Sequence, residues 1–242
     1  MPQQDDPIDV TFFVPCLNEE KNVIGAVETI VSAVGRAGRS YEIIIVDDHS
    51  ADNSVSVIEG YRAQHPELPI QLIRNQKQKG LGRNYADVAF LGRGKYYKWL
   101  GASNMEFADD VAAVLEKMGE ADMILPYLET DQRSRKRRML SVLFVKIINA
   151  ISGYSLKYYN GSALHRRANV MRWHSYSYGY SFQAELIIRL LEEGATYFEV
   201  PTRCAQKGPV RTKAFSLHNV FSVTHSLLQI FLLTTRHKLF NK

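Results

Sequence analysis

The chain has 242 residues, 45% of them hydrophobic and 23% charged, an ordinary globular composition with neither an internal repeat nor a low-complexity linker. Its net charge of +5 and sequence pI near 9.1 favour anionic partners, but they do not distinguish phosphates from lipid headgroups or nucleic acid. Two distant cysteines, Cys16 and Cys204, argue against a disulfide scaffold or a zinc site and fit a reducing cytosol.

Predicted strands and helices alternate along the first part of the chain. Apolar, β-branched runs at residues 10–14 and 41–48 predict two buried strands, and a shorter strand is expected over residues 70–74. Residues 18–34 carry apolar side chains every three or four positions, which is typical of a helix with one buried face, and a second helix is expected over residues 50–64. This order predicts an α/β domain with an open, mostly parallel Rossmann-type sheet and helices on both faces.

The same alternation continues with a glycine-marked loop and helix over residues 79–94, strands over 96–100 and 122–127, and helices over 109–118 and 140–151. Sheets of this kind bind their ligands beyond the carboxyl ends of the strands. The polar residues that fall at these ends are Asn18, Glu19, Asp47, Asp48 and His49.

Five sequence motifs occur in the order and spacing of a known family. The first motif is the pair FVPCLNEEKN and EIIIVDDHSADNS. The other four are KGLGRNYA, YYNGSALHRR, GYSFQAELIIRLLEEG and VPTRCAQKGPVRTKA. With them the chain resembles family 2 glycosyltransferases, in particular the dolichol-phosphate mannosyltransferases and the polyprenyl-phosphate sugar transferases. The resemblance implies a GT-A-like domain over residues 1–214, followed by a C-terminal amphipathic helix over residues 215–242. It also implies an inverting sugar transfer from a nucleotide-diphospho-sugar to a polyprenyl phosphate, a lipid-linked saccharide or a polysaccharide.

Carboxylates at the strand ends are candidates to bind the nucleoside of the sugar donor. Asp48, or its neighbour Asp47, could accept hydrogen bonds from the base; alternatively, the two residues cap the helix that follows. The resemblance adds Pro15 as a wall of the base slot, Glu19 near the ribose, and Asn18 in the same site.

A glycine-marked loop is the candidate site for the diphosphate. Gly80 and Gly82 remove side-chain obstruction, and Lys79 and Arg83 supply positive charge, with Arg83 able to contact phosphate oxygens in pairs. A turn with solvated cations before a helix is the competing interpretation. Ser103 completes the predicted nucleotide-sugar site.

The chain departs from the family after the strand at residues 96–100. The family usually carries an Asp-x-Asp element there, which holds Mg²⁺ or Mn²⁺ against the diphosphate. This chain has Gly101, Ala102 and Ser103, so Ser103, Asn104 and Glu106 remain as weaker metal ligands. Whether the site binds a divalent cation, Mg²⁺ or Mn²⁺, is therefore left open. The alternative function is a nucleotide-sugar-binding or regulatory subunit with weakened catalysis.

Two further motifs supply candidate catalytic and phosphate-binding residues. Glu185, with Gln183 before it, is placed to act as a general base if the acceptor is a hydroxyl, or else to position the donor or acceptor. An exposed acid paired with Arg189 is the alternative for Glu185. The segment 207–213 resembles a phosphate-binding lid, for which solvated charge is the alternative, and its candidate residues are Lys207, Arg211, Thr212 and Lys213.

Two segments predict contact with a membrane surface. The basic run Arg133–Arg138 precedes an apolar helix, and its alternatives are a nucleic-acid contact, a localisation tag or simply solvated charge. The segment Val220–Thr235 is apolar but too short to span a bilayer. We expect an interfacial helix with basic flanks at residues 220–238; packing on the protein body or on a second copy in a homo-oligomer is the alternative. The N-terminus lacks the pattern of a secretion signal, so we expect a peripheral enzyme at the cytoplasmic face of a membrane. The acidic strand-end residues argue against nucleic acid as a partner.

Overall fold

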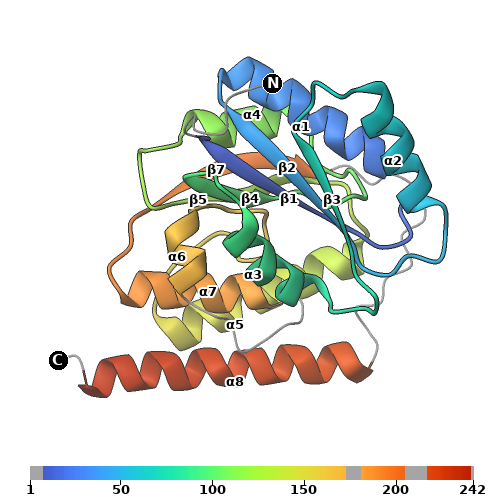
Figure 1. The fold of residues 1–242 in the computed structure, drawn as a ribbon. Helices are drawn as coiled ribbons and strands as arrows, with labels where there is room; N and C mark the ends of the chain where they lie inside the picture. Colours follow the sequence, from blue (N-terminus) through green and yellow to red (C-terminus); the bar gives the residue numbers. More distant parts are fainter. Residues whose placement is uncertain (1–7, 173–180, 205–216, 241–242) are drawn as a thin grey trace.

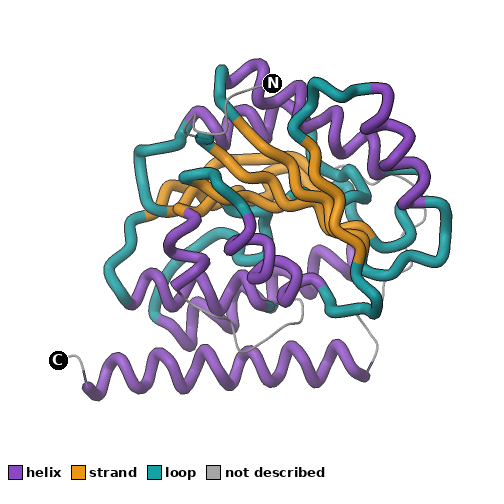
Figure 2. Tube along the Cα trace, viewed as in Figure 1, coloured by secondary structure: helices purple, strands orange, loops and turns teal. Residues whose placement is uncertain are grey.

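The computed structural model describes residues 8–172, 181–204 and 217–240, which form an open sheet with helices on both faces (Figures 1 and 2). The strand order across the sheet is β3-β2-β1-β4-β6-β5-β7. The strands are β1 (Val10–Cys16), β2 (Tyr41–Asp47), β3 (Ile70–Arg74), β4 (Tyr96–Trp99), β5 (Met123–Asp131), β6 (Leu164–Arg166) and β7 (Tyr197–Cys204).

The pairing of the strands confirms the predicted mostly parallel α/β sheet. Strands β1 to β4 are parallel to one another where they pair, and β5 is parallel to β7. The short strand β6 runs antiparallel to both β4 and β5 and joins the two halves of the sheet. The sequence analysis did not identify β6, because three residues are too few to show the alternation of a strand.

The helices lie in layers on the two faces of the sheet (Figure 1). The first face is covered by α1 (Val23–Ala37), α2 (Ser54–Gln64) and α4 (Ala108–Glu116). The second is covered by α3 (Leu81–Leu91), α5 (Arg135–Ser152), α6 (Arg167–Arg172) and α7 (Phe182–Glu192). The long helix α8 (Leu217–Phe240) forms a further layer against α5 and α7.

Apolar periodicity explains why these segments pack as they do. The buried residues of α1 recur every three or four positions, and the helix ends where Gly38 adopts a left-handed φ of 60°. In β2, Ile43 and Ile45 face the core under α1, whereas Ile44 and Val46 face the core under α3 and α7. Full burial of each such side chain stabilises the fold by about 1.5–3 kcal/mol before the entropy cost of ordering the chain.

Helix α8 has one buried side and one exposed side. Ser226, Ile230 and Thr234, spaced by one helical turn, are buried against the body of the protein. Its exposed large apolar residues are Leu228, Phe231, Leu232 and Leu239. Packing on the body therefore accounts for one side of the helix and leaves the other side available. Among the helices of the described residues, none combines the length and apolar character needed to cross a bilayer.

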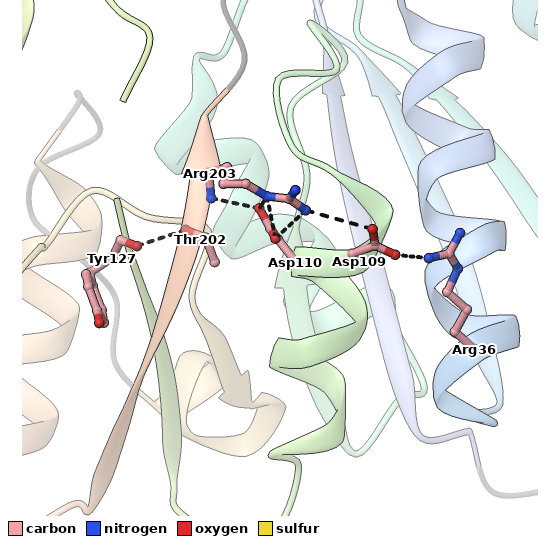
Figure 3. A network of polar contacts seen from close by, with 6 residues as sticks. All are labelled: Arg36, Asp109, Asp110, Tyr127, Thr202 and Arg203. Atoms are coloured by element: carbon pink, nitrogen blue, oxygen red, sulfur yellow. Dashed lines mark hydrogen bonds and ion pairs between the residues drawn. The ribbon is translucent and has the colours of Figure 1, made fainter. Parts of the chain in front are cut away.

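A network of ion pairs ties the carboxyl end of β7 to the first face of the sheet (Figure 3). Arg203 donates hydrogen bonds to Asp110 at the start of α4, at 2.7 to 3.2 Å, and its guanidinium stacks on the ring of Phe107. Asp109 also pairs with Arg36 of α1. Exposed ion pairs each contribute less than about 1 kcal/mol, so this network fixes geometry more than it adds stability.

Candidate donor-binding site

The carboxylate of Asp48 anchors the loop that precedes α3. Asp48 lies just beyond β2, and its two oxygens accept hydrogen bonds from the backbone N–H groups of Lys79 and Gly80, each at 2.9 Å. The side-chain amide of Asn75 donates a third bond at 2.8 Å. Gly80 adopts a φ of 87°, which favours glycine, so its lack of a side chain is what permits this turn. Asp48 therefore brings the predicted phosphate loop to the end of β2.

Burial and hydrogen bonding act on Asp48 in opposite directions. Burial raises the pKa of the carboxyl group, but the polar groups of Lys79, Asn84, Asn75 and Gly80 around it together lower its pKa below the ordinary value. The group is therefore ionised at neutral pH and keeps the loop in place.

The loop after β1 is bound to the loop after β2. The backbone N–H of Asn18 donates to Ser50 Oγ at 2.9 Å, and Asn18 Oδ1 accepts from the backbone N–H of Ala51 at 2.8 Å. The backbone N–H of Glu19 donates to Ser54 Oγ at 2.9 Å. These bonds bring Asn18 and Glu19 to the same edge as Asp48. We call this edge, formed by residues 15–22, 47–54, 75–83 and 100–107, the donor edge.

Asp47 does not cap helix α2, which was the alternative to a role in binding the base. Helix α2 begins at Ser54 rather than Ser50, so neither Asp47 nor Asp48 occupies its N-cap position. Asp47 is buried, and its Oδ2 accepts from the backbone N–H of Ser50 at 3.2 Å. Within the part of the chain that the structure describes, its Oδ1 has no hydrogen-bond partner.

The donor edge continues at the loop after β4, which is bound to a buried lysine of β4 itself. The Lys98 ammonium is fully buried and donates to Glu106 Oε2 at 3.3 Å and to the carbonyl and hydroxyl oxygens of Ser162 at 2.5 and 2.6 Å. Ser162 Oγ in turn donates to Glu106 Oε1 at 2.8 Å. Burial lowers the pKa of Lys98, and the charge of Glu106 opposes that effect. Both carboxylate oxygens of Glu106 are thus engaged by the protein.

The candidate metal ligands after β4 do not converge on one point. The Asn104 side chain turns toward α1, where its Oδ1 accepts from the Thr29 hydroxyl at 3.0 Å. Glu106 is held by Lys98 and Ser162, and Ser103 is partly exposed. Among the described residues, no three His, Cys, Asp or Glu side chains are grouped as a metal site would require. These donors do not fit a divalent cation bound by carboxylates.

The first turn of α7 is buried under α3 and the centre of the sheet. Phe182 packs its ring against Tyr85 of α3, with centroids 4.9 Å apart. The Gln183 amide faces the Tyr85 hydroxyl and the His165 imidazole, and it opposes the effect of burial on the pKa of each. The pKa of His165 is lowered to about 4, first by burial. We call this group of Tyr85, His165, Ser181 and Gln183 the α7 interior.

Polar atoms of the α7 interior lack hydrogen bonds of normal geometry. Over residues 8–172, 181–204 and 217–240, the Tyr85 hydroxyl, both His165 nitrogens, the Ser181 hydroxyl and both Gln183 amide atoms have no partner. Glu185, one turn further along α7, is also buried and lies 3.5 Å from the guanidinium of Arg189. The pair with Arg189 is therefore present, but the acid is buried rather than exposed.

Some predicted residues cannot be placed. The lid residues Lys207, Arg211, Thr212 and Lys213 lie outside the described residues.

The two predicted cations of the phosphate loop, Lys79 and Arg83, are both exposed near the start of α3. The ammonium of Lys79 pairs with Asp87 at 2.8 Å.

Sequence reasoning missed three residues of this site: Asn75, Lys98 and Ser162. Asn75 follows β3 directly, so the strand-end argument that identified Asp48 could have found it. Lys98 had a signal too, because a charged residue in the apolar run YYKWL must find a partner if the strand is buried. Ser162 had none.

The sequence profile of one protein family, described as Glycosyl transferase family 2, matches residues 11–176. The chain belongs to this family. The match confirms the predicted resemblance and covers β1 through β6, including the donor edge.

Curated relatives are about a quarter identical to the chain over the segments that align. A dolichyl-phosphate beta-glucosyltransferase of Dictyostelium discoideum is 24% identical over 132 residues, which are 50% of this chain and 40% of that protein. An undecaprenyl-phosphate 4-deoxy-4-formamido-L-arabinose transferase of Shewanella sediminis is 26% identical over 153 residues, 62% of this chain and 45% of that protein. The chain thus matches less than half the length of either relative.

Solved structures of similar fold cover nearly the whole chain. A mannosyltransferase of Pyrobaculum calidifontis in complex with GDP-Man and Mn²⁺ has a TM-score of 0.64 and 18% identity, covering 98% of this chain and 66% of that one. Glucosyl-3-phosphoglycerate synthase of Mycobacterium tuberculosis with Mn²⁺, UDP and phosphoglyceric acid has a TM-score of 0.67 and 14% identity, covering 91% and 78%. These neighbours confirm the predicted GT-A-like fold, and the Mn²⁺ they hold is consistent with a divalent cation in proteins of this fold.

Proposed function

We propose that this chain transfers a sugar from a nucleotide-diphospho-sugar to the phosphate of a polyprenyl lipid. The observation that carries the proposal is the donor edge, where Asp48 holds the Lys79–Gly80 loop beside the bound loops of β1 and β2. It lies within a region of glycosyl transferase family 2. The names of the dolichyl-phosphate and undecaprenyl-phosphate relatives support the class of acceptor.

Each segment of the donor edge is assigned to one portion of the nucleotide-sugar. The nucleoside would lie over the ends of β1 and β2, against Pro15, Asn18 and Glu19, with the acidic pair Asp47 and Asp48 behind it. The diphosphate would lie against the start of α3, with the sugar extending past Ser103. The charge of the diphosphate would be balanced by Lys79, Arg83 and the lid residues Lys207, Arg211 and Lys213, and the hydroxyl of Thr212 would donate a hydrogen bond to it.

The chemistry needs little from the protein beyond position and charge. A phosphate oxygen of the acceptor lipid attacks the anomeric carbon of the sugar, while the bond from that carbon to the diphosphate oxygen breaks. The nucleoside diphosphate leaves with the electron pair, and in-line attack inverts the anomeric carbon. An ionised phosphate has no proton to lose, so Glu185 and Gln183 serve to position the reactants rather than to act as a base.

The acceptor lipid implies contact with a membrane surface. Helices α5 and α8 pack together, and both expose large apolar residues: Met139, Leu140, Val142 and Leu143 on α5, and Leu228, Phe231, Leu232 and Leu239 on α8. The first turn of α5 adds the exposed cations Arg135, Lys136 and Arg138. Apolar side chains beside cations favour the surface of an anionic membrane, where the two kinds of group are both stabilised.

The test is release of nucleoside diphosphate from a panel of UDP- and GDP-sugars by the purified chain, with and without undecaprenyl phosphate or dolichyl phosphate. We expect release that depends on the lipid phosphate and produces a sugar-phosphate lipid. A matched control is Asp87→Asn, which removes only the exposed partner of Lys79 and should leave the rate unchanged. Nucleotide binding with no lipid-dependent release would contradict the proposal and favour the nucleotide-sugar-binding subunit instead.

A further inference from the structure

The loop after β4 carries no carboxylate at the two positions where the family usually holds a metal. Gly101 and Ser103 stand there, with Ala102 between them. Steric crowding does not explain the glycine, because a Cβ built at Gly101 would meet Ser103 Oγ at 3.5 Å and Trp99 Cζ3 at 3.7 Å, ordinary contact distances. The backbone at position 101 therefore leaves room for the Cβ of a larger residue, and crowding at the Cβ does not account for the missing carboxylate.

The nearest substitute ligands are already used by the protein. Asn104 is bound by Thr29, and its amide packs so closely on α1 that a Cβ at Gly25 would lie 2.5 Å from Asn104 Nδ2. Glu106 receives bonds from Lys98 and Ser162 on both of its oxygens. A metal that recruited Glu106 would take away the counter-charge of a fully buried ammonium group, which is costly.

The charge of Lys98 also lies against this same loop. Its ammonium contacts Glu106, which is five positions beyond Gly101 in the chain, so the acid of this loop is already paired with a buried cation. A divalent cation at the end of β4 would therefore have to compete with the buried Lys98 for this carboxylate.

From these contacts we infer that this chain binds the diphosphate of its nucleotide-sugar without a divalent cation. The inference rests on the proposed function and deepens it, since it names how the donor's charge is neutralised. The protein supplies that charge itself, through the exposed cations Lys79 and Arg83 at the start of α3. The exposed pair of Lys79 with Asp87 is weak enough to exchange for a phosphate.

A first experiment is titration calorimetry of the purified chain with UDP and with GDP, each in EDTA and in Mn²⁺. For the nucleotide that binds, we expect the dissociation constants in the two conditions to agree within about twofold, because no carboxylates bridge a metal to the phosphates. Binding that requires Mn²⁺ would overturn this inference and leave the proposed function in place. Failure of both nucleotides to bind in either condition would overturn the proposed function and this inference together.

A second experiment restores the missing ligands with the double substitution Gly101→Asp and Ser103→Asp. The matched control is Gly60→Asp on α2, an exposed glycine where an added Cβ would have no neighbour within 4 Å. We expect Mn²⁺ to tighten nucleotide binding about tenfold in the double variant, where two carboxylates can hold the ion, and to change nothing in the control. An equal response of the two variants would overturn the assignment of metal independence to positions 101 and 103.

Discussion

Asp48 and Lys98 at the donor edge are bonded differently from the buried polar groups of the α7 interior. At the donor edge, Asp48 accepts three hydrogen bonds and Lys98 is paired with Glu106. In the α7 interior, the polar atoms of His165 and Gln183 are buried without a hydrogen-bond partner among the described residues. An unsatisfied buried polar group costs about 1–3 kcal/mol, so the α7 interior gives up stability that the donor edge retains.

This difference separates a preformed site from an adaptable one. The donor edge holds its loops in place before any ligand arrives, which lowers the entropy cost of binding a nucleotide. Among the residues that the structure describes, the α7 interior leaves buried polar atoms without partners, and such departures from full hydrogen bonding are typical of sites that serve function rather than stability. Gln183 and Glu185 lie on this second, adaptable element.

The largest expected effect is at the ion pair of the donor edge. Glu106→Gln leaves the Lys98 ammonium buried without a counter-charge, so the free energy of unfolding should fall by about 3–5 kcal/mol in urea denaturation. The control is the double variant Lys98→Met with Glu106→Gln, which removes both charges and should recover most of the loss. A single variant as stable as the unmodified chain would show that the pair contributes nothing.

A second prediction concerns the pH dependence of stability. His165 has a pKa of about 4 in the folded protein, against 6.5 for an ordinary histidine, so the unfolded chain binds the proton more readily. Stability should therefore be fully present above pH 6.5 and decline by up to about 3 kcal/mol as the pH falls to about 4.

The measurement for His165 is thermal unfolding between pH 7 and about pH 2 for the unmodified chain and for His165→Phe. The variant should lose the part of the slope between pH 6.5 and 4. The steeper loss below pH 4 should remain, because Asp48, whose pKa is lowered, is protonated there and releases its loop. Parallel profiles for the two proteins would mean that His165 is not buried in its neutral form.

A third, smaller effect is expected at Asp48. Asp48→Ala leaves the N–H groups of Lys79 and Gly80 without their acceptor, so the free energy of unfolding should fall by about 2 kcal/mol and nucleotide binding should be lost. Calorimetry and urea denaturation measure the two effects. The matched variant Asp87→Ala removes an exposed carboxylate from the same lysine and should cost less than about 1 kcal/mol. Equal nucleotide affinity in both variants would contradict the role given to Asp48.

The smallest effect is expected in the α7 interior, where a substitution should raise the free energy of unfolding rather than lower it. Gln183→Leu removes an unsatisfied buried amide, so the free energy of unfolding should rise by about 1 kcal/mol while sugar transfer slows. Asn84→Leu is the control, because Asn84 is buried but bonded to Asn75, and its loss should destabilise the protein. A less stable Gln183→Leu variant would mean that ordered water satisfies this amide.

The fold and the first half of the donor edge could be predicted because both follow from local rules. Parallel strands end at a common edge, so Asp48 and Glu19 had to lie near each other once the alternation of strands and helices was recognised. The family's motif order gave the same result independently.

The rest depends on contacts that chain spacing does not reveal. Lys98 bonds to Ser162, which is 64 positions away in the chain. This contact depends on the antiparallel strand β6, which the sequence pattern did not predict. Whether Glu106 faces a metal or a lysine was likewise decided by packing, since its residue type suits both. The burial of Gln183 and Glu185 was not predicted, because local sequence does not show that Tyr85 of α3 and helix α8 pack against α7.

The most direct test of the central claim is the NMR spectrum of the backbone amides during titration with the nucleoside diphosphate that binds. We predict that the amide shifts that change most belong to residues 15–22, 47–54 and 79–83, the three loops that Asp48, Ser50 and Ser54 hold together. Changes confined to other parts of the chain, with these loops unaffected, would contradict the assignment of the donor edge.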